Sequence, residues 1–340
     1  MRVAVLGAGS WGTAMAAMRA ERDPTVLWAR RPPLAGRIAD LGRNPDYLPD
    51  LALPASLRVT ASLSDALSGA EVIVLAVPSH GVRATLTEAR AELVDGVPVV
   101  SLVKGLEERT LRRVTEIVEE VLPDRPTAVL TGPNLVDEIV AGHPTASVVA
   151  ARDPSLAREL QQLFTTSSFR VYTNDDVVGC ELGGALKNVF AIAAGIADGM
   201  GFGDNTRAAL ITRSLAELAR LGTALGGRAE TFAGLAGMGD LVATCTSRHS
   251  RNRATGEQVA RGHPPAAVAA ATRTVAEGVR TSLAVVELAG AVGVEMPIAE
   301  QVAAVLHHGR PVSEVVASLM GRASRGEGDA IASGWKGPVP

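Results

Sequence analysis

Residues 3–12 read Val-Ala-Val-Leu-Gly-Ala-Gly-Ser-Trp-Gly, and this segment indicates how the first half of the chain folds. Its four apolar residues predict a strand, and a helical pattern begins directly after the turn. In such a unit Gly7 permits the tight turn, Gly9 lets the backbone approach a pyrophosphate, and Gly12 allows the helix to pack closely on the strand. A GxGxxG motif alone is weak and could be a plain tight turn, but strand before and helix after favour dinucleotide binding.

The same alternation continues through the first half of the chain. Short apolar runs separated by helical patterns predict a parallel sheet covered on both faces, the doubly wound Rossmann-like architecture. The expected strands are Val3–Leu6, Thr25–Trp28, Val72–Val77, Val97–Leu102 and Thr127–Leu130, with two more around Ala146–Ala150 and Phe169–Tyr172. The expected helices are Trp11–Glu21, Ser79–Leu93 and Thr110–Val121.

The pattern changes near Asn174–Gly179, after which helical periodicity dominates as far as Leu319. Turn signals such as Gly226-Gly227 separate the helices, of which Thr281–Ala289 and Ile298–His307 are two. We therefore expect an α/β protein with a dinucleotide-binding domain over residues 1–178, an all-helical substrate domain over 179–325, and a flexible tail over 326–340.

Composition excludes several classes of protein. The 340 residues carry 33 basic and 36 acidic side chains, a net charge of -3, and only ten aromatic residues. That balance argues against a basic, base-stacking nucleic-acid binder. Two cysteines without a CxxC pair fit a reducing cytoplasm, and scattered histidines predict no metal site. Apolar stretches such as Val189–Ala197 are shorter than the roughly 20 residues that span a bilayer, so no membrane insertion is expected.

Only three of the basic residues are lysines, Lys104, Lys187 and Lys336, and the other 30 are arginines. Arginine cannot replace lysine where a compact, titratable ammonium is needed. Lys336 lies in the expected tail. Lys104 follows an expected strand, at the sheet edge where ligands bind, and Lys187 follows Gly183-Gly184-Ala-Leu. A surface cation and a snorkelling lysine are the alternatives, but both settings favour function.

Arg30 and Arg31 follow the second expected strand, where an NAD site usually carries an acidic residue for the ribose 2′-hydroxyl. Two guanidiniums suit a 2′-phosphate instead, by bidentate hydrogen bonding and stacking. Two solvated arginines at a helix start are the alternative. The sequence predicts a preference for NADPH.

Several segments together resemble the bacterial type of NAD(P)-dependent glycerol-3-phosphate dehydrogenase. They run in order across almost the whole chain and are collectively specific. The segments are Gly7–Ala14, Asn44–Pro49, Val77–His80, Lys104–Leu106, Thr131–Pro133, Leu182–Asn188, Leu235–Leu241, Ser250–Arg253 and Glu277-Gly278.

The resemblance implies reversible reduction of dihydroxyacetone phosphate to sn-glycerol 3-phosphate, which supplies glycerophospholipid synthesis. It makes Lys187 the proton donor and acceptor and Asp240 its companion carboxylate. A positioned ammonium suits this reaction because negative charge develops on the ketone oxygen as hydride arrives. A helix-capping aspartate is the alternative reading of Asp240.

The resemblance also assigns binding residues. Substrate contacts fall on Lys104, Gly132, Asn134, Lys187, Asp240 and Thr244, with Ser250, Arg251 and Asn252 for the phosphate. Cofactor contacts fall on Gly7, Gly9, Ser10, Trp11, Gly12, Arg30, Arg31, Lys104, Val136, Arg251, Val275 and Glu277. A surface Ser-Arg helix start is the alternative for residues 250–252. His80, His143 and His249 are interpreted as structural or surface residues.

Two stretches depart from the family pattern. Asn134-Leu135-Val136-Asp137 stands where the family commonly has Ser or Thr followed by Phe-Ala, and it places a negative charge near an expected anionic ligand. The second strand is preceded by Arg22-Asp23-Pro24 without the usual glycine. Other functions stay open: another two-domain reductase of a hydroxy or keto acid, or a catalytically silent NADPH sensor. A homodimer is common for such enzymes and is expected here.

Overall fold

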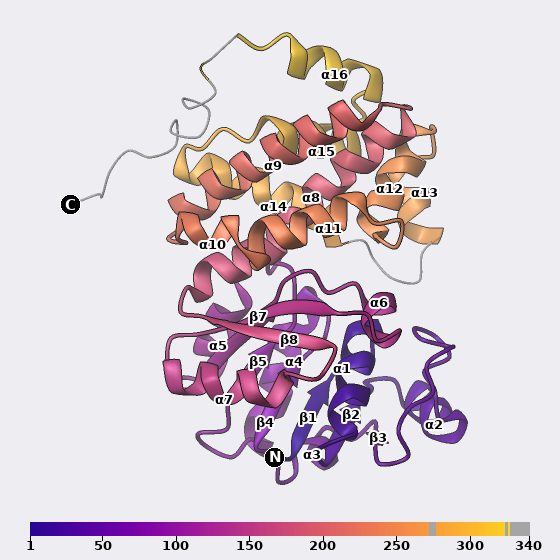
Figure 1. Ribbon diagram of the computed structural model, residues 1–340, viewed down its shortest axis with the longest axis vertical. Helices are drawn as coiled ribbons and strands as arrows, with labels where there is room; N and C mark the ends of the chain where they lie inside the picture. Colours follow the sequence, from indigo (N-terminus) through magenta and orange to yellow (C-terminus); the bar gives the residue numbers. More distant parts are fainter. Residues whose placement is uncertain (272–276, 324–325, 327–340) are drawn as a thin grey trace, which may run out of the picture. The chain divides into compact units, whose positions relative to one another are not determined.

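The computed structural model describes residues 1–271, 277–323 and 326, and the chain divides into two compact units, Met1–Val177 and Val178–Pro340. The first unit is built on an eight-stranded sheet with the order β3-β2-β1-β4-β5-β6-β7-β8 (Figure 1). All neighbouring strands are parallel except β6 and β7. The predicted mostly parallel sheet is therefore confirmed. The strands are β1 (Val3–Leu6), β2 (Thr25–Trp28), β3 (Arg58–Thr60), β4 (Val72–Leu75), β5 (Val99–Ser101), β6 (Thr127–Thr131), β7 (Thr145–Ala151) and β8 (Phe169–Asn174).

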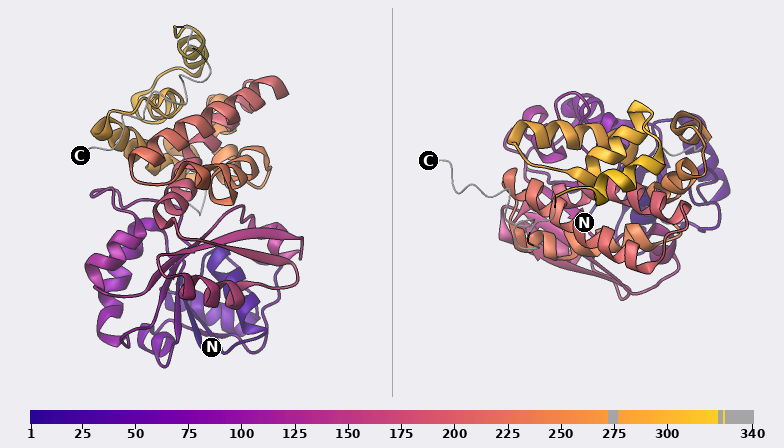
Figure 2. Two further views of the ribbon diagram at one scale, coloured as in Figure 1. Left: turned by 60° about the vertical axis from the view of Figure 1, so that its left-hand side comes forward. Right: turned by 90° about the horizontal axis from the view of Figure 1, so that it is seen from above.

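Helices cover both faces of this sheet (Figures 1 and 2). Side chains alternate along a strand, so Val3 and Val5 join one buried cluster while Ala4 and Leu6 join the other. The first cluster includes residues of α1 (Ser10–Ala20), α2 (Pro32–Leu41), α6 (Val136–Val140) and α7 (Pro154–Phe164). The second includes residues of α3 (Leu63–Leu67), α4 (Val82–Ala89) and α5 (Val114–Val121).

Some elements differ from the sequence prediction. The edge strand β3 and the helices α3 and α6 were not predicted, because elements of five residues or fewer give little periodic signal. The longer helices α2 and α7, of 10 and 11 residues, were also missed. The predicted helix Ser79–Leu93 consists of α4 between short 3₁₀ turns, Ser79–Gly81 and Arg90–Glu92. Helix α5 begins at Val114 rather than at Thr110, because the preceding residues form a turn in which the Leu111 amide donates to the Glu107 carbonyl over 2.8 Å.

The turn before β2 works without the usual glycine. The Arg22 and Asp23 amides both donate to the Arg19 carbonyl, over 2.9 and 2.8 Å. The buried Arg19 guanidinium donates to the Asp23 carboxylate and to the Leu163 carbonyl. This ion pair closes the turn, so the departure in sequence leaves the start of β2 unchanged.

The described residues of the second unit form helices joined by turns, without a strand, which confirms the predicted change of character. The predicted helices Thr281–Ala289 and Ile298–His307 lie within α14 and α15. Val275, Lys336 and all of the predicted tail except Gly326 lie outside the described residues. The helices are α8 (Val177–Gly199), α9 (Asp204–Ala224), α10 (Ala229–Ala233), the π-helical turn Leu235–Gly239, α11 (Asp240–Thr246), α12 (Arg251–Ala260), α13 (Pro265–Ala271), α14 (Glu277–Val292), α15 (Pro297–His308) and α16 (Val312–Met320).

Helix α8 is longer than the apolar stretch Val189–Ala197 that the sequence shows within it. Its 23 residues reach a mean hydropathy of 1.4 over 18 residues, which by length and composition alone would suffice to cross a membrane. However, 94% of that window is buried inside the protein. Such burial is typical of a core helix, and α8 is the helix that carries Lys187.

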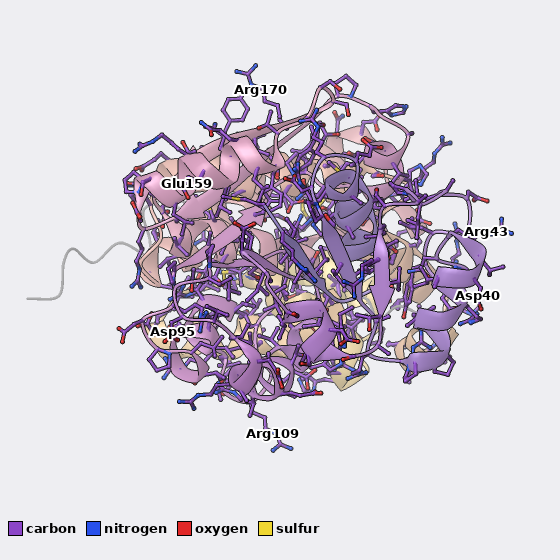
Figure 3. All side chains as sticks on the ribbon, turned by 90° about the horizontal axis from the view of Figure 1, so that it is seen from below. Asp40, Arg43, Asp95, Arg109, Glu159 and Arg170 are labelled. Carbon is purple, nitrogen blue, oxygen red and sulfur yellow. The ribbon has the colours of Figure 1, made fainter. Side chains whose placement is uncertain are left out.

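Charged side chains of the first unit gather on its periphery. Figure 3 shows Asp40, Arg43, Asp95, Arg109, Glu159 and Arg170 pointing outward, and all six are exposed. Both signs of charge occur among them. These side chains are solvated and belong to no predicted site.

Candidate functional site

The glycine turn has the geometry that a dinucleotide needs. Gly7 has a φ of +124°, and a Cβ there would lie 2.6 Å from the Ala76 carbonyl. A Cβ on Gly12 would lie 2.0 Å from the Gly7 carbonyl oxygen. Around Gly9, in contrast, no heavy atom lies within 4 Å of the added Cβ position. The first and third glycines are therefore required by packing, while the second leaves open space at the start of α1 for a phosphate.

Five side chains of this unit contain buried polar atoms without a hydrogen-bond partner: Arg2 and Arg19, each at Nε, Trp11 at the indole nitrogen, Asn134 at both amide atoms, and Thr131 at the hydroxyl. The other two guanidinium nitrogens of Arg19 are paired within the chain. Unpaired buried polar atoms are costly, and those of Trp11, Asn134 and Thr131 can gain partners from a bound ligand. Trp11 and Asn134 were predicted to contact ligands, and Thr131 was not. These atoms and the space beside Gly9 fit a bound dinucleotide and a polar substrate.

The two arginines after β2 behave differently. Arg31 donates to the Asp46 carboxylate over 3.0 Å, and Arg37 donates to its other oxygen over 2.9 Å. Burial alone would raise the pKa of Asp46, but the hydrogen bonds from Arg37 and Arg31 lower it below its ordinary value. Arg30 is exposed and forms no ion pair within the described residues. Arg30 is thus the cation available to a 2′-phosphate.

Asn44 and Asp46 were quoted in the family segment Asn44–Pro49 but were given no role. The Asn44 amide donates to the Ala8 carbonyl over 3.0 Å and to the Thr13 hydroxyl over 2.8 Å. Asn44 therefore fastens this segment to the glycine turn, and Asp46 gathers two arginines beside it. A polar residue followed by Pro-Asp in a loop was the available signal, but its partners lie more than thirty residues away.

Lys104 lies beyond β5, at the carboxyl edge of the sheet. Its ammonium donates to the Gly132 carbonyl over 2.7 Å, which brings together two predicted substrate residues from neighbouring connections. Gly132 has a φ of +126°, a conformation that favours glycine, and the Ser147 Cα lies 3.3 Å from the added Cβ position. The conformation of Gly132 thus turns its carbonyl to the lysine.

The unusual stretch after Gly132 opens α6. Val136 is the first residue of this helix and is half-buried, while Asp137 in its first turn is exposed. A carboxylate in the first turn of a helix is stabilised by the partial positive charge of the helix N-terminus. The exposed position of Asp137 explains how its charge is tolerated in this segment.

In the second unit, Lys187, Asp240 and Thr244 form one buried group. The Lys187 ammonium donates to the Asp240 carboxylate and, over 2.5 Å, to the Thr244 hydroxyl. Thr244 in turn donates to the Asp240 backbone carbonyl over 2.6 Å. The three residues are 5%, 1% and 6% exposed. A buried ammonium held by two oxygens of one helix has a fixed direction, as proton transfer requires.

Glycines bring the two helices of this group together. Lys187 lies on α8 one turn beyond Gly183, where an added Cβ would lie 2.4 Å from the Ala236 carbonyl oxygen. At Gly237 it would lie 2.1 Å from the Phe232 carbonyl oxygen. The π-helical turn that contains Ala236 and Gly237 therefore packs directly on α8. Asp240 begins α11 just after this turn and so reaches Lys187.

Residues 250–252 begin α12 and differ in their surroundings. The Ser250 hydroxyl caps the helix by accepting from the Arg253 amide over 3.3 Å. Arg251 is exposed and makes no ion pair within the described residues, whereas Arg253 donates to the Asp198 carboxylate over 2.6 Å. Ser250 therefore serves as the N-cap of α12, which agrees with the alternative interpretation of residues 250–252 as a surface helix start. Arg251 is the arginine left available to an anion.

Asn252 has partners inside the helical unit. Its amide donates to the Asn188 side-chain oxygen over 2.9 Å, and its own oxygen accepts from the Gly278 amide over 3.1 Å. Asn252 therefore joins α8, next to Lys187, to the start of α14, where Glu277 lies. One amide hydrogen of Asn252 remains for a further acceptor.

Cys245 lies near the Lys187 group but is not a reactive thiol. Burial raises the pKa of the Cys245 thiol to about 12, although Lys187 nearby acts to lower it. This thiol therefore stays protonated and is a poor nucleophile. Among residues 1–271, 277–323 and 326, no group of three His, Cys, Asp or Glu residues could hold a metal ion. His80, His143 and His249 are exposed.

A cavity of about 350 Å³ lies elsewhere in the helical unit, lined mainly by apolar side chains of α8, α9, α15 and α16. None of the predicted site residues lines it. Glu217 on its wall accepts from the Ile298 and Ala299 amides over 2.8 and 3.3 Å. Burial raises the pKa of Glu217 to about 7, although these two amides act to lower it. This carboxylate caps α15 and is separate from the group around Lys187.

Known proteins resemble the chain along almost its whole length. Residues 2–157 match the N-terminal part, and residues 176–317 the C-terminal part, of NAD-dependent glycerol-3-phosphate dehydrogenases. A protein of Sphingopyxis alaskensis named glycerol-3-phosphate dehydrogenase (NAD(P)+) 2 is 50% identical over 320 residues, covering 94% of this chain and 96% of the relative. One of Mycobacterium tuberculosis is 49% identical, covering 94% of each. A crystal structure of glycerol-3-phosphate dehydrogenase from Coxiella burnetii has a TM-score of 0.91 at 37% identity, covering 94% of this chain and 99% of that one.

Proposed function

Because the chain belongs to the family of NAD-dependent glycerol-3-phosphate dehydrogenases, we propose a specific role for each part of its site. The family expected from the sequence motifs is confirmed. The enzyme is an oxidoreductase that reduces dihydroxyacetone phosphate to sn-glycerol 3-phosphate with a nicotinamide cofactor, and the reaction is reversible.

The first unit binds the cofactor. The α1 start beside Gly9 takes the pyrophosphate, since backbone amides and the helix dipole favour an anion there. The Trp11 indole and the Asn134 amide, which are buried without partners, donate to polar atoms of the bound ligands. Ser10 and Val136 are further proposed cofactor contacts of this unit, and Glu277 and Val275 are proposed contacts from the second unit.

Lys187 handles the proton, and its buried position between Asp240 and Thr244 is the observation that carries this proposal. When bound, the reduced nicotinamide supplies a hydride to the carbonyl carbon of the substrate. Lys187 stabilises the negative charge that develops on the carbonyl oxygen and delivers a proton to it. In the reverse direction the neutral amine accepts that proton. Asp240 and Thr244 hold the Lys187 nitrogen in place.

The substrate phosphate is bound at the start of α12. Arg251 has no ion pair among the described residues and can give paired, charge-assisted hydrogen bonds to phosphate oxygens. Ser250 and the free amide hydrogen of Asn252 add donors at the same helix end. Lys104 contributes a second cation toward substrate and cofactor, and Gly132 supports it.

We further propose that the enzyme prefers NADPH. Arg30 is available for the ribose 2′-phosphate, and no acidic side chain directly follows β2 to bind a 2′-hydroxyl. Arg31 lies beside it, paired with Asp46. Measured dissociation constants for NADPH and NADH test this preference, and equal values would reject it.

The biological setting is also a proposal. The product supplies the backbone of glycerophospholipids, and the enzyme works in the cytoplasm as a homodimer. Light scattering after gel filtration tests the last point, with a mass twice the 35.0 kDa of one chain expected. A strain lacking the gene is expected to need added glycerol 3-phosphate for lipid synthesis, and normal lipid synthesis without it would reject the supply role.

The test of the reaction is NADPH oxidation with dihydroxyacetone phosphate, followed by glyceraldehyde 3-phosphate and simple keto acids. We expect turnover with the first substrate and little with the others, since only it offers both a ketone for Lys187 and a phosphate for Arg251. Another two-domain reductase would prefer a keto acid. A silent NADPH sensor would bind cofactor without turnover and would tolerate changes at Lys187 and Asp240.

A further inference from the structure

Lys104 lies in a long connection that has no regular secondary structure. Residues 102–113, between β5 and α5, contain neither helix nor strand. A side chain that must meet two ligands needs a fixed backbone, because a displacement of about 1 Å can cost on the order of 100-fold in rate. The hydrogen bond from Lys104 to Gly132 fixes the ammonium but not the chain that carries it.

Glu107, three residues after Lys104, is held by an arginine of another element. The Arg83 guanidinium donates from Nε and from one terminal nitrogen to the two carboxylate oxygens, each over 2.8 Å. This is the bidentate fork geometry, the strongest form of an arginine–carboxylate pair. The Glu107 side chain is only 16% exposed. The hydrogen bonds from Arg83 lower the pKa of Glu107, so the pair stays ionised.

Arg83 joins two connections at the carboxyl edge of the sheet. It is the second residue of α4, which follows β4 through the segment Val77–Gly81. The same guanidinium reaches the Glu120 carboxylate of α5 over 2.7 Å. One arginine therefore fixes the Lys104 connection against the helices on both sides of it.

The Glu107 backbone closes the connection into a tight turn. Its amide donates to the Arg112 carbonyl over 3.0 Å, and its carbonyl accepts from the Leu111 amide over 2.8 Å. Leu111 has a φ of +56°, which is uncommon for a residue other than glycine and persists only where surrounding contacts hold it. The Thr110 hydroxyl donates to the Glu107 carboxylate over 2.5 Å. Glu107 therefore lies at the centre of a turn that begins three residues after Lys104, and Arg83 binds this turn from α4.

We propose that Arg83 and Glu107 are positioning residues for Lys104, setting the ammonium that meets substrate and cofactor. The inference rests on the proposed function of Lys104. Neither residue touches the ligands. Their pairing fixes the Lys104 backbone, and the contact with Gly132 then aims the side chain.

The scarcity of lysine makes a direct test possible. The chain has only Lys104, Lys187 and Lys336, so trace acetylation followed by peptide mass spectrometry measures each ammonium separately. In Arg83→Gln, Lys104 is expected to react faster relative to Lys187, because its backbone is no longer fixed. The kcat/KM for dihydroxyacetone phosphate is expected to fall about 10-fold or more, with the NADPH KM raised as well. Glu107→Gln should act in the same direction.

Arg112→Gln is the matched control. It removes another arginine from the same network, paired with Glu120 over 3.1 Å, but leaves the Glu107 carboxylate untouched. It should change neither Lys104 labelling nor kcat/KM. If Arg83→Gln does not fold, Arg83→Lys keeps the charge but loses the fork and should show the same shifts to a smaller extent.

Unchanged labelling of Lys104 in a folded Arg83 variant would overturn the inference. Faster labelling with unchanged kcat/KM would also overturn the inference, because it would show that the position of Lys104 does not affect the reaction. In that case a fully active Lys104→Gln enzyme would show that the proposed role of Lys104 had failed, whereas an inactive one would show that the pairing with Arg83 does not set it.

Discussion

The two units build their parts of the site in opposite ways. In the first unit the predicted residues lie on turns at one end of a parallel sheet, and several polar atoms are buried without partners, such as the Trp11 indole and the Asn134 amide. In the second unit Lys187 and Asp240 lie on helices, and Lys187, Asp240 and Thr244 bind one another. The unpaired polar atoms of the first unit can gain hydrogen bonds from a ligand. The polar groups of Lys187, Asp240 and Thr244 are already hydrogen-bonded to one another.

This difference separates binding from chemistry. In our proposal, the unpaired donors at the sheet edge gain their hydrogen bonds when a ligand arrives and so contribute to affinity. The Lys187 ammonium, held by two oxygens on a helix, is directed before the substrate arrives, and we propose that it contributes to the rate. Changes in the first unit should therefore alter dissociation constants, and changes around Lys187 should alter kcat.

Among variants that leave Lys187 in place, the largest effect is expected from Asp240→Asn. The substitution keeps the shape but removes the charge that holds the Lys187 ammonium, so kcat should fall about 100-fold while the NADPH dissociation constant stays the same. Loss of a buried charge partner should also lower the free energy of unfolding by about 3 kcal/mol or more. Steady-state kinetics measure kcat, a fluorescence titration measures the NADPH dissociation constant, and denaturant unfolding measures the free energy of unfolding. A kcat near that of the unaltered enzyme would contradict the separation.

Arg251→Gln tests the proposed phosphate contact, which lies in the second unit but serves binding rather than proton transfer. Losing a charged hydrogen-bonding partner should weaken binding of dihydroxyacetone phosphate by about 2–3 kcal/mol, seen as a raised KM. Arg253→Gln is the control, because Arg253 is already paired with Asp198 and should affect thermal stability rather than KM. If both variants gave the same KM change, the assignment of the phosphate to Arg251 would fail.

Glu217 offers a contrast within the helical unit, as a buried carboxylate without a lysine partner. Its pKa is raised to about 7, so as pH rises from about 4.5 to 7 the unfolded chain loses this proton first. The free energy of unfolding should therefore fall across that window, by on the order of 2 kcal/mol. Denaturant unfolding of Glu217→Gln should lack this fall, and an identical pH dependence would show that Glu217 is not its source.

The smallest effect is expected at Arg30. Because Arg30 meets only the 2′-phosphate in our proposal, Arg30→Gln should reduce the preference for NADPH over NADH about 10-fold and leave kcat unchanged. Arg37→Gln is the matched control, since Arg37 is paired with Asp46 and was not predicted to bind cofactor. The dissociation constants for NADPH and NADH measure this preference. An unaltered ratio of the two in Arg30→Gln would show that Arg30 is not its source.

The strands and the glycine turn could be predicted because their signals are local. A run of four apolar residues followed by Gly7 specifies β1 and its turn within ten residues of sequence. The three-residue strand β3 has no comparable signal, and its pairing with β2 comes from the tertiary fold. Helix α5 begins at Val114 and not at the predicted Thr110, because residues 110–112 belong to a turn that is hydrogen-bonded to Glu107.

In the site, too, local motifs could be predicted from the sequence, while contacts between distant segments could not. The motifs around Lys187 and Asp240 could be recognised, yet their meeting depends on Gly183 and Ala236, which lie 53 residues apart in sequence. The partners of Asn252 on α8 and α14, and the pairing of Arg83 with Glu107, likewise join distant elements. Such contacts follow from how helices pack, which periodicity does not specify.

The most direct measurement of the central claim is the single-turnover rate of Lys187→Arg with saturating NADPH and dihydroxyacetone phosphate, together with its NADPH dissociation constant. Arginine keeps the positive charge but does not give up a proton near neutral pH. We expect the rate to fall about 100-fold or more with unchanged cofactor affinity. A retained rate would contradict the proton role of Lys187, and a lost cofactor affinity would contradict the separation between the two units.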